Sequence, residues 1–183
     1  MTYLCIILII SFTLFIFLEY NELVKDKNAV KEAFATMDVY LKKRWDLIPN
    51  VVQVVENYAI HEKETMKEIV ELRNASYEKM TMTDKMKADE QVTNGVSKII
   101  IIAENYPELK ANEVFLNLSE QLKKVEEDIA NSRKYYNAVV KKLNTKIEMF
   151  PSNLIAKMFG FESADMFQIA SEEKENVNIK INN

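Results

Sequence analysis

His61 and Glu62 are the residues whose spacing comes closest to a known chemistry. In many zinc proteases, two histidines one helical turn apart bind the metal, and a glutamate beside the first acts as general base. The stretch His61-Glu62-Lys63-Glu64-Thr65 has a threonine where the second histidine would stand, and the chain contains one histidine. A metal-dependent hydrolase using His61 and Glu62 is therefore the weakest of the functions that we consider.

The other catalytic arrangements that such residues could support are also incomplete. A di-iron bundle needs two Glu-x-x-His pairs on facing helices, and a Ser-His-Asp triad would need the same His61 with a serine on a strained, glycine-flanked turn. The single cysteine, Cys5, lies in an apolar run, so neither a disulfide within the chain nor a thiolate zinc site is available. We expect no enzyme activity, cofactor, metal or small-molecule substrate. A net charge of −4 also gives no electrostatic basis for nucleic-acid binding.

Several charged side chains fall within or beside the apolar stripes of the predicted helices. They could form interhelical ion pairs that fix the register of the helices, as buried polar groups do in coiled coils, or a polar cluster that binds a small ligand or a metal. We favour ion pairs, and we interpret the neighbouring aromatic side chains as core aromatics and interface rings rather than as a ligand cage. The charged residues are Arg44, Glu62, Arg73, Glu126 and Arg133, and the aromatic ones are Tyr40, Trp45, Tyr135 and Tyr136.

Long helices must position these side chains, because the chain has only two glycines and three prolines to interrupt them. From Asn21 onward, stripe residues recur at a spacing of three and four, which predicts an amphipathic helix. We expect it to end at a corner over residues 46–50, where Asp46 caps a helix end, Pro49 begins the next helix and Asn50 follows. That second helix is predicted to reach Glu78. The stripe of the first helix is Leu23, Lys27, Val30, Phe34, Met37, Leu41, Arg44 and Ile48.

Two more helices and a short turn complete the prediction. The third helix covers residues 84–105 with Thr83 as a plausible N-cap, and its run Ile99–Ile102 is expected to be helical and buried on several sides. The fourth covers residues 112–150 with Asn112 as its cap and Pro151 after its end. Ser152 is expected to cap a short apolar turn over residues 153–159, which ends at Gly160. The predicted fold is all-α, a transmembrane helix continuing into an elongated antiparallel four-helix bundle.

Residues 1–18, MTYLCIILIISFTLFIFL, contain no charged side chain. As a helix they would rise about 27 Å, close to the thickness of the hydrocarbon core of a bilayer. The run lacks the basic start and small-residue cleavage site of a secretory signal, so we favour an uncleaved anchor over a cleaved or buried segment. Lys25, Lys27 and Lys31 follow it, and the positive-inside rule then places the N-terminus outside and the body on the cytoplasmic side of the cell membrane.

Three regions are thus predicted: a transmembrane anchor over residues 1–18, a helical bundle over 19–167 and a mobile polar tail over 168–183. Several stretches of the bundle resemble the LemA family of N-terminally anchored bacterial proteins, above all LKKRWDLIPN at 41–50 and AENYPELKAN at 103–112. The match extends in order over about residues 15–167. It implies an N-out, four-helix fold without an established activity, and a membrane protease or a protein with a TPM-type domain as a partner.

The function that we favour is a single-pass scaffold that self-associates or docks a membrane partner, with membrane lipid bound by residues 1–18. Apolar residues near the end of the bundle need cover, which a second copy or lipid could supply. An alternative is that the turn Leu154–Phe161 binds and shapes the membrane surface, although packing across the end of the bundle is the simpler expectation. The residues of this turn that bear on the choice are Leu154, Ile155 and Phe159.

Overall fold

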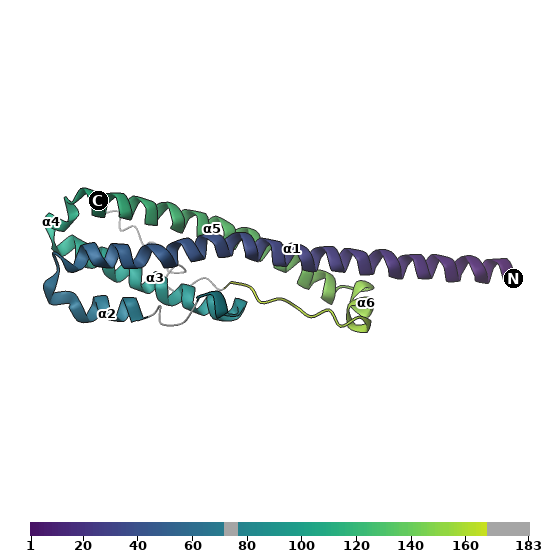
Figure 1. The fold of residues 1–183 in the computed structure, drawn as a ribbon. Helices are drawn as coiled ribbons and strands as arrows, with labels where there is room; N and C mark the ends of the chain where they lie inside the picture. Colours follow the sequence, from purple (N-terminus) through teal and green to yellow (C-terminus); the bar gives the residue numbers. More distant parts are fainter. Residues whose placement is uncertain (72–76, 168–183) are drawn as a thin grey trace, which may run out of the picture. The chain divides into compact units, whose positions relative to one another are not determined.

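The computed structural model describes residues 1–71 and 77–167, and Arg73 and the predicted tail 168–183 lie outside these residues. The described chain is helical and contains no strand, which confirms the all-α fold class (Figure 1). Its elements are α1 (Thr2–Glu56), η1 (Ile60–Glu62), α2 (Lys63–Glu71), η2 (Tyr77–Lys79), α3 (Met82–Asn105), α4 (Pro107–Lys110), α5 (Glu113–Glu148) and α6 (Ser152–Met158).

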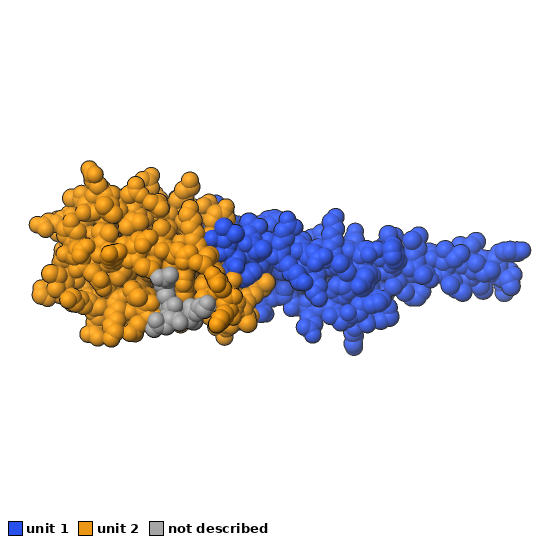
Figure 2. Space-filling view, in the orientation of Figure 1, with its two compact units in different colours: residues 1–39, 129–166 blue, residues 40–128, 167–183 orange. Residues whose placement is uncertain are grey.

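The chain divides into two compact units, which are coloured separately in Figure 2. Unit 1 contains residues 1–39 and 129–166, and unit 2 contains residues 40–128 and, among the described residues, Phe167. The long helices α1 and α5 each contribute one part to each unit. Each unit therefore has its own core, and we describe the two separately.

The N-terminal part of α1 is exposed apolar helix. Within the described residues, α1 is the helix long and apolar enough to cross a bilayer, and the side chains of its apolar window are not buried in the protein. Exposed Leu, Ile and Phe side chains in such a run need a non-aqueous surrounding. This stretch is thus a candidate membrane span, which fits the anchor predicted from the sequence.

Unit 1 buries one face of α1 against the C-terminal part of α5. The rings of Phe34 and Tyr136 meet edge to face with centroids 5.9 Å apart. The Tyr136 hydroxyl donates a hydrogen bond of 2.9 Å to the Asp165 carbonyl, and the Asn144 side chain both donates to and accepts from the backbone of Ala164. These bonds hold the segment after α6 along α5.

An ion pair that the apolar pattern did not reveal also joins α1 to α5 in unit 1. Asp26 is buried, and its carboxylate accepts from the Lys142 ammonium at 2.7 Å and lies 3.9 Å from that of Lys146, which also pairs with Glu22. The sequence pattern assigned Lys27 to the buried stripe, but Lys27 is exposed. Asp26 continues the spacing of three and four between Leu23 and Val30, so the stripe passes through the acidic residue.

In unit 2, hydrogen bonds join the C-terminal part of α1 to α3 and to the N-terminal part of α5, and both α2 and α4 pack against α3. This arrangement is consistent with a four-helix bundle. Met66 and Ile69 of α2 are buried, as are Val92, Val96 and Ile99 of α3. The Ile99–Ile102 run is helical as expected, but Ile100 and Ile101 are exposed, so the expectation that it is buried on several sides is wrong.

The predicted corner at residues 46–50 is wrong, because α1 continues through Pro49 to Glu56 and the chain turns after it. Proline removes one backbone hydrogen bond from a helix interior. Here Ile48, Val51 and Val52 around it are all buried, and the burial of these side chains outweighs the loss. Asp46 is not a cap and instead pairs with Lys42 one turn earlier. The second helix is consequently short, over Lys63–Glu71.

The helix caps give mixed results. Asn112 caps α5 as predicted, since its side-chain oxygen accepts from the Phe115 amide at 3.0 Å. For α3 the cap is Thr81 rather than Thr83, in a reciprocal capping box with Asp84. Ser152 does not cap α6: its hydroxyl donates to the Lys146 and Met149 carbonyls and so closes the end of α5. Gly160 follows α6 with a positive φ of 68°, as its predicted role as a stop requires.

Candidate functional site

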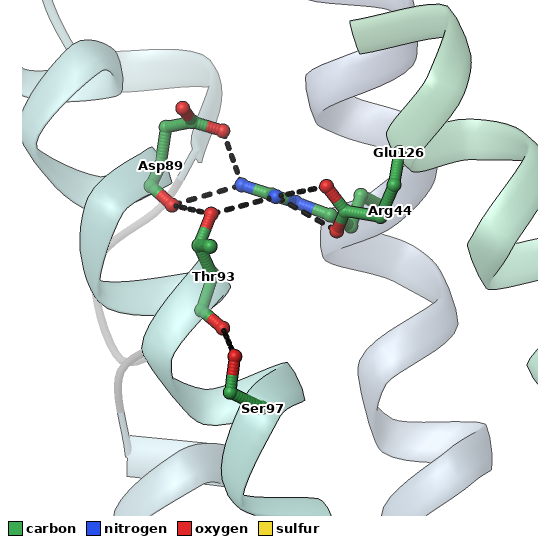
Figure 3. Close-up of polar contacts among 5 residues, drawn as sticks. All are labelled: Arg44, Asp89, Thr93, Ser97 and Glu126. Carbon is green, nitrogen blue, oxygen red and sulfur yellow. Dashed lines mark hydrogen bonds and ion pairs between the residues drawn. The ribbon is translucent and has the colours of Figure 1, made fainter. Parts of the chain in front are cut away.

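The buried polar cluster of unit 2 centres on Arg44 (Figure 3). Its guanidinium Nη1 donates to both carboxylate oxygens of Glu126, at 2.9 and 3.0 Å, and to the Thr93 hydroxyl at 3.0 Å. Nη2 donates to the Asp89 carbonyl at 2.9 Å and to the Asp89 carboxylate. One arginine from α1 thus holds two acidic side chains, one from α3 and one from α5.

Thr93 ties the cluster to the backbone of α3. Its hydroxyl donates to the Asp89 carbonyl at 2.9 Å, and Ser97 donates in turn to the Thr93 carbonyl at 3.1 Å (Figure 3). The carbonyl of Asp89 therefore accepts from both Arg44 and Thr93. The charge of this buried guanidinium is thus balanced and both of its Nη atoms are hydrogen-bonded, whereas its Nε has no hydrogen-bond partner among the described residues.

The cluster brings together two of the predicted charged residues, Arg44 and Glu126, as an ion pair between helices. This is the interpretation that we favoured over a ligand site. Among the described residues no group of three or more His, Cys, Asp or Glu side chains is placed to hold a metal. His61 is exposed and Glu62 half-buried in η1, outside the cluster.

Other predicted residues lie elsewhere. Arg133 belongs to unit 1, Asn50 is exposed on α1, and Arg73 lies outside the described residues. Trp45 is buried and packs on Tyr77 at a centroid distance of 5.3 Å, as a core aromatic does, whereas Tyr135 is exposed and is not part of the core. The pattern missed Asp89, although its spacing of three from Val92 extends the buried stripe of α3 by one turn.

Beside the cluster, unit 2 has a half-open apolar groove of about 450 Å³. Its walls come from α1, α3, α4 and the start of α5, and Ile100 and Leu116 on its edges are each about half exposed. The charged side chains that line it are those of Glu104, Lys110, Lys123 and Glu126, which we call the rim; the first three are exposed and the fourth is half-buried. Its apolar lining includes Val51, Val96, Ile99, Ala103, Phe115 and Leu122. A groove with apolar walls and a charged rim is suited to bind an apolar surface or ligand.

Unit 1 has a second apolar surface, on α6. Ile155 and Ala156 are buried, while Leu154 and Met158 are more than half exposed. Leu154 and Met158 are four residues apart and therefore lie on one face of the helix. The rings of Phe159 and Phe161 pack on Tyr20 with centroid distances of 4.8 and 5.8 Å. The turn thus packs on unit 1 with one face, in line with the expectation that it packs on the protein. Its other face leaves apolar side chains exposed.

The comparisons with known proteins agree with the resemblance noted from the sequence. The family model described as LemA family matches residues 33–181. Protein LemA of Metamycoplasma hominis is 25% identical over 158 residues, which cover 86% of this chain and 72% of that protein. Magnetosome protein MamQ 2 of Paramagnetospirillum magneticum is 22% identical over 186 residues, which cover 87% of this chain and 68% of that protein. Magnetosome protein MamQ of Magnetospirillum gryphiswaldense is 21% identical over 185 residues, which also cover 87% of this chain and 68% of that protein. By the length of the match to the family model, the chain belongs to the LemA family.

Proposed function

We propose that the chain is a single-pass, non-catalytic membrane scaffold whose helical body is held at the membrane at two points. The first is the apolar start of α1, which spans the bilayer with its N-terminus outside. The second is the exposed apolar face of α6, which lies in the interfacial layer on the cytoplasmic side. The observation that carries the proposal is the packing of Phe159 and Phe161 on Tyr20.

Tyr20 is the second residue after the uncharged run, at the position where a membrane-spanning helix leaves the hydrocarbon. Tyrosine is enriched at that level because its ring is apolar and its hydroxyl is hydrated. Side chains that touch the Tyr20 ring lie at the same depth. The exposed Leu154 and Met158, which belong to the same short helix as the buried Ile155, are then within reach of lipid.

The charges around this surface favour the same placement. Lys157 of α6, which lies between Leu154 and Met158 in the sequence, is exposed. The Lys27 ammonium lies 5.6 Å from the centre of the Phe161 ring. Lysines with long apolar stems keep their ammonium groups at the headgroups while the stems lie along apolar surface. A body held at two points presents the remaining helical surface of the protein to its partners, as a scaffold requires.

The test measures the depth of single side chains in reconstituted full-length protein. In a Cys5→Ser background, which removes the one native thiol, an environment-sensitive dye is attached at Met158→Cys and, as the matched water-facing control, at the exposed Lys134→Cys of α5. We expect the dye at 158 to be quenched by lipids that carry a quencher near the headgroup, and the dye at 134 to be unquenched.

A dye at Phe12→Cys, tested with lipids that carry the quencher in their acyl chains, reports on the anchor separately. Quenching at 12 without quenching at 158 would keep the anchor and reject the contact of α6 with the membrane. No quenching at 12 would reject membrane insertion itself. The measurement therefore distinguishes a protein tethered at one point from the two-point scaffold that we propose.

A further inference from the structure

We propose that the apolar groove of unit 2 is the surface through which two copies of this chain associate, each filling the groove of the other with its exposed edge residues Ile100 and Leu116. The inference deepens the proposed scaffold function by naming its partner. The experiment below measures dimer formation, whereas the test of the two-point scaffold measures contact with lipid. The scaffold proposal and the dimer proposal can therefore each fail without the other.

The groove and its edges together form a surface that is complementary to itself. The groove supplies an apolar hollow of about 450 Å³, and Ile100 and Leu116 supply apolar side chains that stand at its margin about half exposed. In a twofold interface the same patch is used by both subunits, so a hollow and a projection must both be present on it. Here one surface supplies the hollow and, at Ile100 and Leu116, half-exposed apolar side chains that a second copy can contact.

The rim has charges of both signs. Glu104 near the end of α3, Lys110 of α4 and Lys123 of α5 all line the groove. In the twofold dimer that we propose, Glu104 of each copy pairs with a lysine of the partner. Such charges contribute mainly to orientation and to the rejection of wrong partners. A partner with a single sign of charge, such as an anionic lipid, would meet Glu104 and Glu126 as well as the lysines.

The proposed anchor lowers the affinity that this surface needs. Confinement to a membrane raises the local concentration of the chain, so that a weak interface is occupied without the buried area of a stable soluble dimer. A groove of this size with two apolar edges fits a weak interface of that kind.

Site-directed crosslinking of the full chain in membranes tests the inference. In the Cys5→Ser background, single cysteines are placed at Leu116 and Ser119, both of which line the groove, and at the exposed Thr83 as the control on the same unit. A short bismaleimide should give a dimer with Leu116→Cys and Ser119→Cys and only the background level with Thr83→Cys. Equal dimer fractions at the three positions would overturn the proposal.

Two variants separate self-association from other occupants. Leu116→Glu puts a charge on an exposed edge and should abolish crosslinking through Ser119→Cys while helical content and the urea midpoint stay unchanged. Glu104→Lys should lower the dimer fraction by about fivefold, as expected for the loss of exposed charge pairs. A compensating Lys110→Glu or Lys123→Glu should restore it.

Failure of both compensating variants to restore the dimer would exclude the twofold charge pairing. Native mass spectrometry of the full chain released from membranes supplies the remaining outcome. A bound lipid that is lost in Leu116→Glu, without any dimer, would assign the groove to lipid and reject the proposal.

Discussion

Replacement of Arg44 by methionine should destabilise unit 2 strongly. Methionine keeps most of the length and apolar volume of the side chain but removes the guanidinium. The Arg44 side chain is 1% exposed and that of Asp89 is 4%, so the Asp89 carboxylate would be left buried without its countercharge. Glu126, at 32%, can still reach water. The expected loss therefore comes mainly from Asp89.

The size of the effect follows from the burial of the pair. Removing one partner of a buried ion pair costs about 3–5 kcal/mol, because the other charge is then uncompensated. The matched control is Lys42→Ala, which breaks a pair on the same helix whose side chains are 38% and 50% exposed. Exposed pairs contribute only about 0–1 kcal/mol. The two variants should therefore differ by several kcal/mol.

Trp45 makes the measurement specific to unit 2. It is the one tryptophan of the chain, is buried next to Arg44 and packs on Tyr77. Its fluorescence during urea unfolding of the full chain in detergent micelles reports the loss of this core. With a urea dependence of about 2 kcal/mol/M, a loss of about 4 kcal/mol lowers the midpoint by about 2 M.

A third variant identifies the cause of the loss. Arg44→Met combined with Asp89→Leu removes both buried charges, and buried pairs replaced by apolar side chains are often neutral in stability. We expect the double variant to recover most of what the single variant loses. The reasoning would be refuted by an Arg44→Met midpoint no lower than that of Lys42→Ala, or by a double variant as unstable as the single one.

Two further predictions concern single hydrogen bonds with a pH dependence. Tyr136→Phe removes the bond to the Asp165 carbonyl and should cost about 1 kcal/mol at neutral pH. Burial, with a smaller contribution from the Asp165 charge, raises the pKa of Tyr136 from 10.0 to about 12. The pKa of Tyr136 is thus higher in the folded than in the unfolded state. The stability that the protonated Tyr136 hydroxyl contributes is therefore complete below about pH 10 and is lost as the pH rises toward 12. Circular dichroism during urea unfolding should therefore show a steeper alkaline loss of stability for the wild type than for Tyr136→Phe. Thr81→Ala should cost about 1 kcal/mol as the loss of an N-cap, and Thr83→Ala almost nothing. The Thr81 hydrogen bonds lower the pKa of Asp84, so the effect of Thr81→Ala should shrink as the pH falls through that lowered pKa, which acid-side unfolding curves would reveal.

The sequence predicted some of the features that depend only on neighbouring residues, although the caps expected at Thr83 and Ser152 were wrong. Asn112 caps α5 and Gly160 follows α6, because a cap and a left-handed turn each need only one suitable residue at one position. The apolar spacing likewise predicted the all-α class and the stripe of the first helix, in which Leu23, Met37 and Leu41 are buried. Local chemistry and tertiary packing agree at these positions.

Pro49 and Asp89 show where local patterns are insufficient. Proline favours a corner locally, but the burial of the side chains around it keeps α1 helical. Asp89 stands at a stripe position, yet a search for apolar residues passes over it, and only the approach of Arg44 makes its burial favourable. The groove depends on which side chains of α1, α3 and α5 leave a space between them. No periodicity along one helix contains that information.

Glu126 belongs to both features of unit 2, since its carboxylate pairs with Arg44 and its side chain lines the groove. A substitution there would change the stability of the core and the surface of the groove together, so a lost dimer could not be assigned to either. Arg44 does not line the groove, and Leu116 takes no part in the cluster. Arg44→Met should therefore lower the unfolding free energy in monomer and dimer alike, whereas Leu116→Glu should abolish association at unchanged unfolding free energy of the monomer. This opposite pattern of effects separates what stabilises unit 2 from what unit 2 binds.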